Sequence, residues 1–391
     1  MNDKPRILIL TDFYLPGYKS GGGLRTLVNM IERLSDEFDF RVITRNHDGW
    51  GDFSPYDSVK TNDWNTVGNA RVYYFGAKGI SLPLLRGLWR EVAPDAVYIN
   101  SFLSTLTIKA MLLWRSFQVM KKTIVIAPEG EFSDGALQIK KRKKKIFLKL
   151  TRRLNWNNKI VWKAAAKEEK EDIRRILGEE CEIYVAPNLQ PKTLFPEYRR
   201  ENKPLKEAGK MRVVFLSRVN RKKNLSFALS ALAGQKGEIE FDIYGALDDE
   251  AYWQECQHLI KQMPENIKVS FKGSLAYEKV AETLVQYHFF ILPTLGENFG
   301  HVVIEALAAG CPVLLSDKTP WRNLNSQGAG WDLSLDDKET WQAVMQKCIQ
   351  MSAEDYMALA QSARDFSVSW LAAPEIEKAN RAVLRVAIER K

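Results

Sequence analysis

Two glutamates in the second half of the chain have the type and spacing to hold a sugar nucleotide. Glu297 lies in a short glycine-containing loop, and Glu305 follows eight residues later, about two turns into the next helix. A helix N-terminus preceded by glycine presents backbone N–H groups and a positive dipole end, which suits a phosphate. Carboxylates would instead accept hydrogen bonds from hydroxyls, which a sugar nucleotide carries on both sides of its diphosphate. The alternative is that Glu297 caps the helix and Glu305 faces solvent.

Two basic residues provide the complementary charge. Arg218 and Lys223 are five residues apart, where a strand-like run ends and the next helix begins. Fixed cations near the Glu297 loop would neutralise a diphosphate leaving group as its charge develops in the transition state. The alternative is a solvated basic turn, which also describes the neighbouring Arg221 and Lys222.

The elements that would position these residues are short apolar strands alternating with helical stretches. In the first half the expected strands are Arg6–Phe13, Phe40–Arg45, Ala70–Phe75, Ala96–Asn100, Thr123–Ala127, Lys159–Lys163 and Glu182–Val185. In the second half they are Met211–Val219, Glu238–Gly245, Ile267–Gly273, His288–Pro293 and Cys311–Ser316. The segment from His47 to Asn69 is predicted to be a long polar excursion. This alternation is typical of an α/β fold with parallel sheets covered on both faces.

The chain of 391 residues is longer than one hydrophobic core usually serves. We predict an N-terminal domain over residues 1–189, a second domain over 190–372 and a final helix over 373–391 that packs back toward the first domain. The polar, proline-containing segment from Gln190 to Lys210 is predicted to be the linker. Two Rossmann-like, doubly wound domains would face each other across a cleft, a favoured kind of ligand site.

The charge is concentrated in one segment. The chain has a net charge of +9, and residues 121–175 hold 17 Lys/Arg against 7 Asp/Glu. The centre of this segment, on a predicted helix with a short apolar stripe, is the run Lys140, Lys141, Arg142, Lys143, Lys144 and Lys145. A basic amphipathic helix is typical of contact with an anionic membrane surface. A solvated helix face is the alternative, and no motif or aromatic pattern favours nucleic acid.

Several other classes are disfavoured. No apolar run reaches the length of a membrane-spanning helix, and the N-terminus lacks the basic region of a signal peptide. The four cysteines are scattered without metal-ligand spacing, so we expect reduced cytosolic thiols and no metal site. The pairs Asp248-Asp249 and Asp336-Asp337 are interpreted as helix N-terminal charges. Gly21–Gly23 lie at the first strand-to-helix junction but do not form a dinucleotide fingerprint, which disfavours an NAD-dependent dehydrogenase.

Together these motifs resemble glycosyltransferase family 4, the retaining group 1 enzymes of GT-B fold. The resemblance rests on Glu297-x7-Glu305 with Phe299-Gly300, Arg218-x4-Lys223, the early glycine-rich loop and Pro187-Asn188. The stretches GENFGHVVIEALAAGCPVLLSDKTPW, PGYKSGGGLRTL and GALQIKKRKKKIF are similar to bacterial enzymes that assemble exopolysaccharide and lipopolysaccharide. This resemblance covers essentially the whole chain, and its specific part lies in the second half.

The resemblance implies roles on the donor side. Glu297 would hold the donor sugar hydroxyls near the reacting carbon, and Glu305 would bind the ribose. Arg218 and Lys223 would hold the diphosphate, with further donor contacts from Gly22, Gly23, Asn298, Phe299, Gly300 and His301. The donor would be a UDP- or GDP-sugar, used as a substrate without metal or other cofactor. Retention in this family is usually interpreted as front-face attack, in which the acceptor hydroxyl loses its proton to the departing phosphate.

On the acceptor side the chain departs from the family pattern. Many members carry a histidine at a strand end of the first domain, whereas the matching strand ends here give Asn100 and Glu129. Glu129 is either an acceptor-site acid or the mark of an altered site. The resemblance implies transfer to a polyprenyl-diphosphate-linked or other glycan at the cytoplasmic face of the membrane. A sugar-nucleotide epimerase and a non-catalytic scaffold of the same fold are the alternatives.

Overall fold

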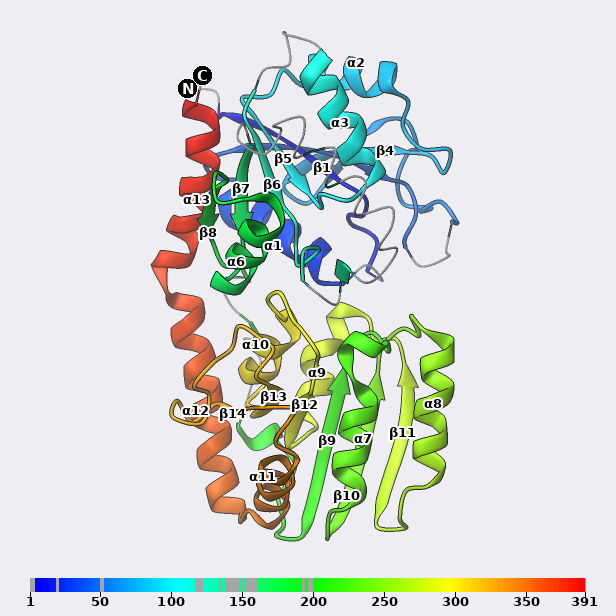
Figure 1. Cartoon of the computed structure of the whole chain (residues 1–391), viewed down its shortest axis with the longest axis vertical. Coiled ribbons are helices and arrows are strands. Elements are labelled where there is room, and N and C mark those ends of the chain that lie inside the picture. The colour runs from blue at the N-terminus through cyan, green and yellow to red at the C-terminus, as the bar shows by residue number, and fades with distance from the viewer. Residues whose placement is uncertain are drawn as a thin grey trace. The chain divides into compact units, whose positions relative to one another are not determined.

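The chain folds into two compact units, seen in the computed structural model of Figure 1. One unit contains Met1–Pro191 together with Ala373–Lys391, and the other contains Lys192–Ala372. The structure describes residues 4–390 except 19–20, 50–52, 117–121, 134–135, 138–147, 149–150, 152–159, 192–193 and 196–199. The run Lys140–Lys145, predicted to contact a membrane, lies outside the described residues.

The first unit is built on an eight-stranded sheet of order β3-β4-β2-β1-β5-β6-β7-β8. Its strands are β1 (Arg6–Thr11), β2 (Asp39–Arg45), β3 (Trp64–Val67), β4 (Ala70–Phe75), β5 (Ala96–Asn100), β6 (Ile124–Ala127), β7 (Ile160–Ala164) and β8 (Glu182–Val185). All neighbouring strands run parallel except β3 and β4, which are antiparallel. The apolar sequences of the parallel strands follow from burial on both faces of the sheet.

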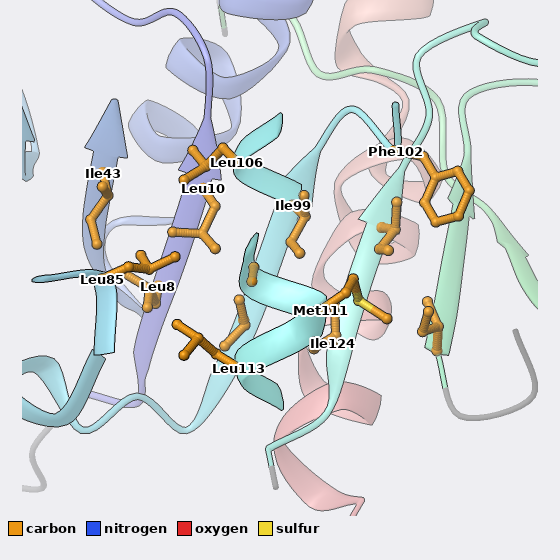
Figure 2. Packing of buried hydrophobic residues seen from close by; sticks show 14 of the residues in the cluster. Leu8, Leu10, Ile43, Leu85, Ile99, Phe102, Leu106, Met111, Leu113 and Ile124 are labelled. Carbon is orange, nitrogen blue, oxygen red and sulfur yellow. The ribbon is translucent and has the colours of Figure 1, made fainter. Parts of the chain in front are cut away.

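Helices cover both faces of this sheet. They are α1 (Gly22–Leu34), α2 (Leu82–Val92), α3 (Thr105–Ser116), α6 (Lys167–Leu177) and α13 (Pro374–Glu389). Because side chains alternate along a strand, Leu8 and Leu10 of β1 enter the core beneath α2 and α3. Figure 2 shows this core, with strand side chains meeting Leu106 and Met111 of α3.

The opposite face of the first sheet is covered by α1 and α13. Ile7 and Ile9 of β1 pack there with Leu27 of α1 and with Leu384 of α13. An ion pair also joins the two helices, because Arg33 contacts Glu377 at 2.5 Å. The last helix of the chain is therefore an integral part of the core of the first unit.

The second unit contains a parallel six-stranded sheet of order β11-β10-β9-β12-β13-β14. Its strands are β9 (Lys210–Leu216), β10 (Glu238–Tyr244), β11 (Ile267–Gly273), β12 (Phe289–Leu292), β13 (Val313–Ser316) and β14 (Gly330–Leu333). Its α-helices are α7 (Leu225–Ala233), α8 (Glu250–Lys261), α9 (Val280–Val285), α10 (His301–Ala308), α11 (Lys338–Gln350) and α12 (Ala353–Ala372). Short 3₁₀ turns lie at Arg200–Asn202, Arg221–Lys223 and Tyr277–Lys279.

Two of these strands were not predicted from the sequence. The polar excursion contains β3, an edge strand with no fully buried residue, which pairs with β4 through the turn at Gly68. The other strand, β14, has only four residues and includes a glycine and an aspartate. Neither strand has the apolar run by which the other strands were recognised.

Each sheet has a topological switch point, where successive connections leave in opposite directions. In the first unit it lies between β1 and β5, and in the second it lies between β9 and β12. In open α/β sheets, ligands bind outside the carboxyl ends of the strands at such points. The candidate site residues can therefore be located relative to these two positions.

Candidate functional site

The loops that follow β9 and β12 are joined by hydrogen bonds at the switch point of the second unit. The 3₁₀ turn after β9 is capped by Asn220, whose Oδ1 accepts a hydrogen bond from the Lys223 N–H at 3.1 Å. Asn224 follows in a left-handed conformation and donates its side-chain amide to the Pro293 carbonyl at 3.0 Å. In return, the Leu295 N–H donates to the Lys222 carbonyl at 2.8 Å. These bonds place the predicted cationic turn directly against the predicted glutamate loop.

An ion pair between Lys223 and Glu297 lies at this junction. Their side chains are only 11% and 14% exposed, so each charge depends on the other for its compensation. Burial raises the pKa of Glu297, but the Lys223 ammonium and its hydrogen bond outweigh burial, and the net effect lowers the pKa. Glu297 is therefore held as a carboxylate, a hydrogen-bond acceptor suited to hydroxyl groups.

The Glu297 loop ends at the start of α10. Gly300 is the N-cap residue, in a left-handed conformation at φ +80° and without a side-chain cap. Glu305 lies inside α10 and is only 5% exposed. The alternative in which Glu297 caps the helix and Glu305 faces solvent is therefore wrong. His301, the first residue of the helix, is also buried, and its ring packs against Phe299 with centroids 5.0 Å apart.

Arg218 lies just beyond β9, where the sequence placed it, but it has a partner that the sequence did not reveal. Its Nη1 atom lies 3.1 Å from Asp248 Oδ2, which also accepts a hydrogen bond from Asn220 at 2.8 Å. The interpretation of Asp248 as a helix N-terminal charge therefore needs correction, because this carboxylate braces the turn after β9. Arg221 fits the solvated alternative, since it pairs with Glu255 and is 57% exposed.

The other expected helix caps are present. Asp249 accepts a hydrogen bond from the Tyr252 N–H at 3.0 Å at the start of α8. Asp337 does the same for the Thr340 N–H at 3.0 Å at the start of α11. Their interpretation as helix N-terminal charges is confirmed. Among the described residues, no cluster of three or more His, Cys, Asp or Glu could hold a metal ion.

In the first unit, the glycine-rich segment and Asn100 meet at the β1/β5 switch point. Gly22 and Gly23 form the first turn of α1, and Gly21 is its N-cap residue. The side-chain amide of Asn100 donates to the Gly23 carbonyl at 3.2 Å. A Cβ atom on Gly23 would lie 3.4 Å from the Asn100 Nδ2 atom, which is van der Waals contact, so Asn100 lies directly against the first turn of α1.

Glu129 lies beyond β6 in a network that includes two buried residues. Its backbone is left-handed at φ +52°, and its Oε2 atom accepts a hydrogen bond from the Asn188 amide at 3.0 Å. Asn188 Oδ1 in turn accepts a hydrogen bond from Lys163 Nζ at 2.7 Å. Burial lowers the pKa of Lys163, although Glu129 and Glu169 oppose this effect. The motif Pro187-Asn188, recognised only as part of a resemblance, thus links a buried cation to Glu129.

Glu169 completes this network and was missed in the sequence. Its two carboxylate oxygens accept hydrogen bonds from the Gly130 N–H at 2.6 Å and the Ala165 N–H at 2.7 Å. Burial and the nearby Glu129 raise the pKa of Glu169 to about 7. In the sequence, Glu169 lies in the charged run KEEKED, which is typical of a solvated helix start. This pattern does not distinguish a buried glutamate from an exposed one. The Glu129–Gly130 turn is therefore held by Asn188 and by Glu169.

Comparison with known proteins identifies the domain. The family model described as glycosyl transferases group 1 matches residues 198–366, which include the Lys223–Glu297 pair and Glu305. This chain carries a group 1 glycosyltransferase domain. The matched residues cover nearly the whole second unit, and over them the resemblance to group 1 glycosyltransferases drawn from the sequence is confirmed.

Two curated relatives share part of the chain. The O-antigen chain mannosyltransferase RfbU of Salmonella typhimurium is 24% identical over 100 residues, which are 26% of this chain and 28% of that protein. The poly(glycerol-phosphate) alpha-glucosyltransferase of Bacillus subtilis is 28% identical over 194 residues, which are 48% of this chain and 26% of that protein. The matches therefore span about a quarter of the length of these relatives.

Solved structures share the fold over nearly the whole chain. A sucrose-phosphate synthase from Thermosynechococcus elongatus aligns with a TM-score of 0.77 at 14% identity, covering 99% of this chain and 100% of that one. Anabaena Alr3699/HepE in complex with UDP and glucose aligns with a TM-score of 0.70 at 16% identity, covering 98% and 100%. WaaG, a glycosyltransferase involved in lipopolysaccharide biosynthesis, aligns with a TM-score of 0.66 at 14% identity, covering 98% and 100%. The predicted GT-B fold class, with two Rossmann-like parallel-sheet domains, is confirmed.

Proposed function

We propose that the protein is a retaining glycosyltransferase that moves a sugar from a nucleotide-sugar donor to a saccharide acceptor. The observation that carries this proposal is the Lys223–Glu297 pair at the β9/β12 switch point, inside a group 1 domain. A cation, a carboxylate held ionised and a helix N-terminus converge there. A sugar diphosphate has matching groups, because its phosphates need cations and N–H donors and its sugar needs acceptors.

In this proposal the second unit binds the donor. Lys223, Arg218 and the α10 N-terminus balance the negative charge of the diphosphate as it leaves. Glu297 accepts hydrogen bonds from the donor sugar hydroxyls, and Glu305 accepts them from the ribose. The charge separation between the sugar ring and the leaving phosphate is greatest in the transition state. These contacts therefore stabilise the transition state more than the bound substrate, which lowers the barrier to transfer.

The bond changes follow from retention. The bond between the anomeric carbon and the phosphate oxygen breaks as the acceptor hydroxyl attacks on the same face of the ring. The hydroxyl proton passes to the departing phosphate oxygen, so the products are a glycoside and a nucleoside diphosphate. The chain's own residues position the donor and stabilise charge, and no side chain forms a covalent intermediate.

The donor and the acceptor are proposed by class. HepE was solved with UDP and with UDP-glucose, which supports a nucleoside diphosphate sugar of the UDP or GDP type. RfbU is an O-antigen chain mannosyltransferase and WaaG is involved in lipopolysaccharide biosynthesis, which supports a glycan acceptor of bacterial surface polysaccharide. We propose that this acceptor is lipid-linked and is met at the cytoplasmic face of the membrane, where the basic segment would contact anionic lipid. Among the residues that the structure describes, none of the helices has the length and hydrophobicity of a membrane span.

The proposal is tested by separating donor binding from sugar transfer. The wild type is incubated with UDP- and GDP-hexoses and with methyl glycosides as acceptors, and the release of nucleoside diphosphate and new glycoside is measured. Glu297→Ala should abolish release while the nucleoside diphosphate still binds. Loss of both would make Glu297 a structural residue, and formation of an epimerised nucleotide sugar by the wild type would establish the epimerase instead.

A further inference from the structure

The Glu297–Gly300 loop is held in place by the segment that follows β13. The backbone N–H of Glu297 donates to the Lys318 carbonyl at 2.9 Å. At the other end of the loop, the indole N–H of Trp321 donates to the Phe299 carbonyl at 2.6 Å. The loop that carries the proposed donor-binding carboxylate is therefore tied at both ends to residues that the sequence did not assign to the site.

The second tie is reinforced by ring packing. Phe299 and Trp321 are each only 5% exposed, and their ring centroids lie 5.4 Å apart. Trp370 of α12 contacts both rings, at 5.6 Å from Phe299 and 5.4 Å from Trp321. Because the Trp321 ring is enclosed by neighbouring aromatic rings, its indole N–H has a fixed direction.

The turn before Trp321 also limits its freedom. Thr319 Oγ1 accepts a hydrogen bond from the Trp321 N–H at 3.3 Å and donates one to the Trp321 carbonyl at 3.4 Å. The indole Nε1 atom would lie 3.6 Å from a Cβ atom built on Gly300, so the ring edge lies against the N-cap residue of α10. Trp321 thus contacts the loop at the peptide unit that joins Phe299 to Gly300.

The direction of that peptide unit decides what it can bind. In a trans peptide, the C=O and the following N–H point in opposite directions. Because the Phe299 carbonyl is turned toward the indole, the Gly300 N–H is turned away from it. The same bond therefore sets the direction of a backbone donor at the N-terminus of α10, where N–H groups attract anions.

We propose that Trp321 is a positioning residue for the donor, which fixes the Phe299–Gly300 peptide so that its N–H faces the donor diphosphate. This inference rests on the proposed function. Trp321 does not touch the reacting atoms and acts through the peptide unit that it holds. When the indole N–H is removed, this peptide can rotate. Binding of a nucleotide sugar must then order the loop, and the free-energy cost of this ordering weakens the affinity.

The experiment compares two tryptophans in the second unit. Trp321→Phe keeps an aromatic ring and removes the hydrogen bond to Phe299. Trp341→Phe is the matched control, because Trp341 is also buried, donates to the Ser334 carbonyl at 3.0 Å and packs on Phe227. Trp341 belongs to α11, whereas the loop precedes α10. Thermal stability should fall to a similar extent in both variants.

Affinities for UDP, GDP, UDP-glucose and GDP-mannose are measured by calorimetry, and amide hydrogen exchange is followed in peptides spanning residues 294–303. Trp321→Phe should weaken binding of the nucleotide sugar roughly tenfold, the effect of one lost hydrogen bond to a charged ligand. It should also raise exchange in the loop, and Trp341→Phe should change neither. Equal effects of both variants, or unchanged loop exchange in Trp321→Phe, would overturn the inference. If the wild type binds none of the four nucleotides, the proposed function is overturned instead. In that case the amide hydrogen exchange of the loop alone decides whether Trp321 positions it.

Discussion

Lys223 and Glu297 form an ion pair across the β9/β12 switch point, although they are 74 residues apart in the chain. The two loops that carry them are also joined at the Lys222 carbonyl, which accepts hydrogen bonds from the Leu295 N–H and the Thr294 hydroxyl. In the proposed complex, the donor phosphates would share Lys223, while Glu297 would turn one or more of its lone pairs toward the sugar. The pair therefore holds Glu297 as a carboxylate before the donor arrives.

The pair should contribute strongly to stability in a non-additive way. Removal of one member of a buried pair leaves an uncompensated charge, so Lys223→Met should lower the free energy of unfolding by about 3 kcal/mol. The double variant Lys223→Met/Glu297→Gln removes both charges and should recover about 1 kcal/mol or more of that loss. Urea denaturation, followed by tryptophan fluorescence, is measured for the wild type, Lys223→Met, Glu297→Gln and the double variant. Strictly additive effects of the two substitutions would show that the pair has no coupling energy.

Gly300 should not tolerate a side chain. Its φ of +80° disfavours any L-residue, and a Cβ atom would lie 3.1 Å from Glu297 Cγ and 3.2 Å from Val303 Cγ2. Gly300→Ala should therefore cost about 1–3 kcal/mol and weaken nucleotide binding. Gly87 in α2 is the control, since it has no neighbour within 4 Å of a built Cβ atom and alanine is the better helix former. Gly87→Ala should stabilise the protein by about 0.5–1 kcal/mol, and a similar gain for Gly300→Ala would contradict the loop geometry.

His288 should make the protein sensitive to acid. Burial, together with Lys206 and Lys203, lowers the pKa of this histidine from 6.5 to about 3, and its Nδ1 atom accepts a hydrogen bond from the Arg212 N–H at 2.9 Å. Between these pKa values the unfolded chain binds one more proton than the folded chain. Stability from this residue is therefore complete above pH 6.5 and falls as the pH drops toward 3, by about 1.4 kcal/mol per pH unit.

The acid effect of His288 can be isolated by substitution. His288→Asn retains an acceptor for the Arg212 N–H but does not titrate. Urea denaturation is measured from about pH 7.5, above both pKa values, down to about pH 4.5, which lies between them. The stability of this variant should fall less steeply with decreasing pH than that of the wild type. The same slope in both proteins would show that His288 is not the titrating group.

The basic segment gives a prediction about membrane binding. Replacement of Lys140, Lys141, Lys143, Lys144 and Lys145 by Glu should release the protein from anionic liposomes in a sedimentation assay. A charge-matched control changes five exposed lysines elsewhere to Glu, namely Lys236, Lys261, Lys268, Lys338 and Lys378. This control should still sediment with the liposomes. Equal loss in both variants would indicate a non-specific effect of net charge.

Much of the fold could be predicted because buried parallel strands leave a strong signal. Twelve apolar runs were recognised as strands, and each overlaps a strand of the structure. The two strands that were missed, β3 and β14, are short and lie at the edges of their sheets. The strand β3 has no buried residue, and β14 is largely buried but includes Gly330 and Asp332, so neither has the continuous apolar run of the central parallel strands.

The site could be predicted only in part. Lys223 and Glu297 belong to motifs with fixed spacing, and their meeting follows from the position of both motifs at strand ends. Asp248 and Trp321 could not be found in this way, because each acts through a contact that depends on the three-dimensional path of a loop. Glu169 was hidden for a different reason, since a glutamate in the first turn of a helix is ordinarily a solvated, dipole-compensating residue.

The most direct test of the account is thermal stabilisation by UDP, GDP, ADP, CDP, their sugars and NAD. A ligand at about 100 times its dissociation constant should add about 2.7 kcal/mol, which gives a measurable shift in Tm. The account predicts a shift with one nucleoside diphosphate and its sugar, which is lost in Arg218→Ala and retained in Arg221→Ala, whose guanidinium pairs with Glu255 instead. No shift with any nucleotide, or equal losses in the two arginine variants, would contradict it.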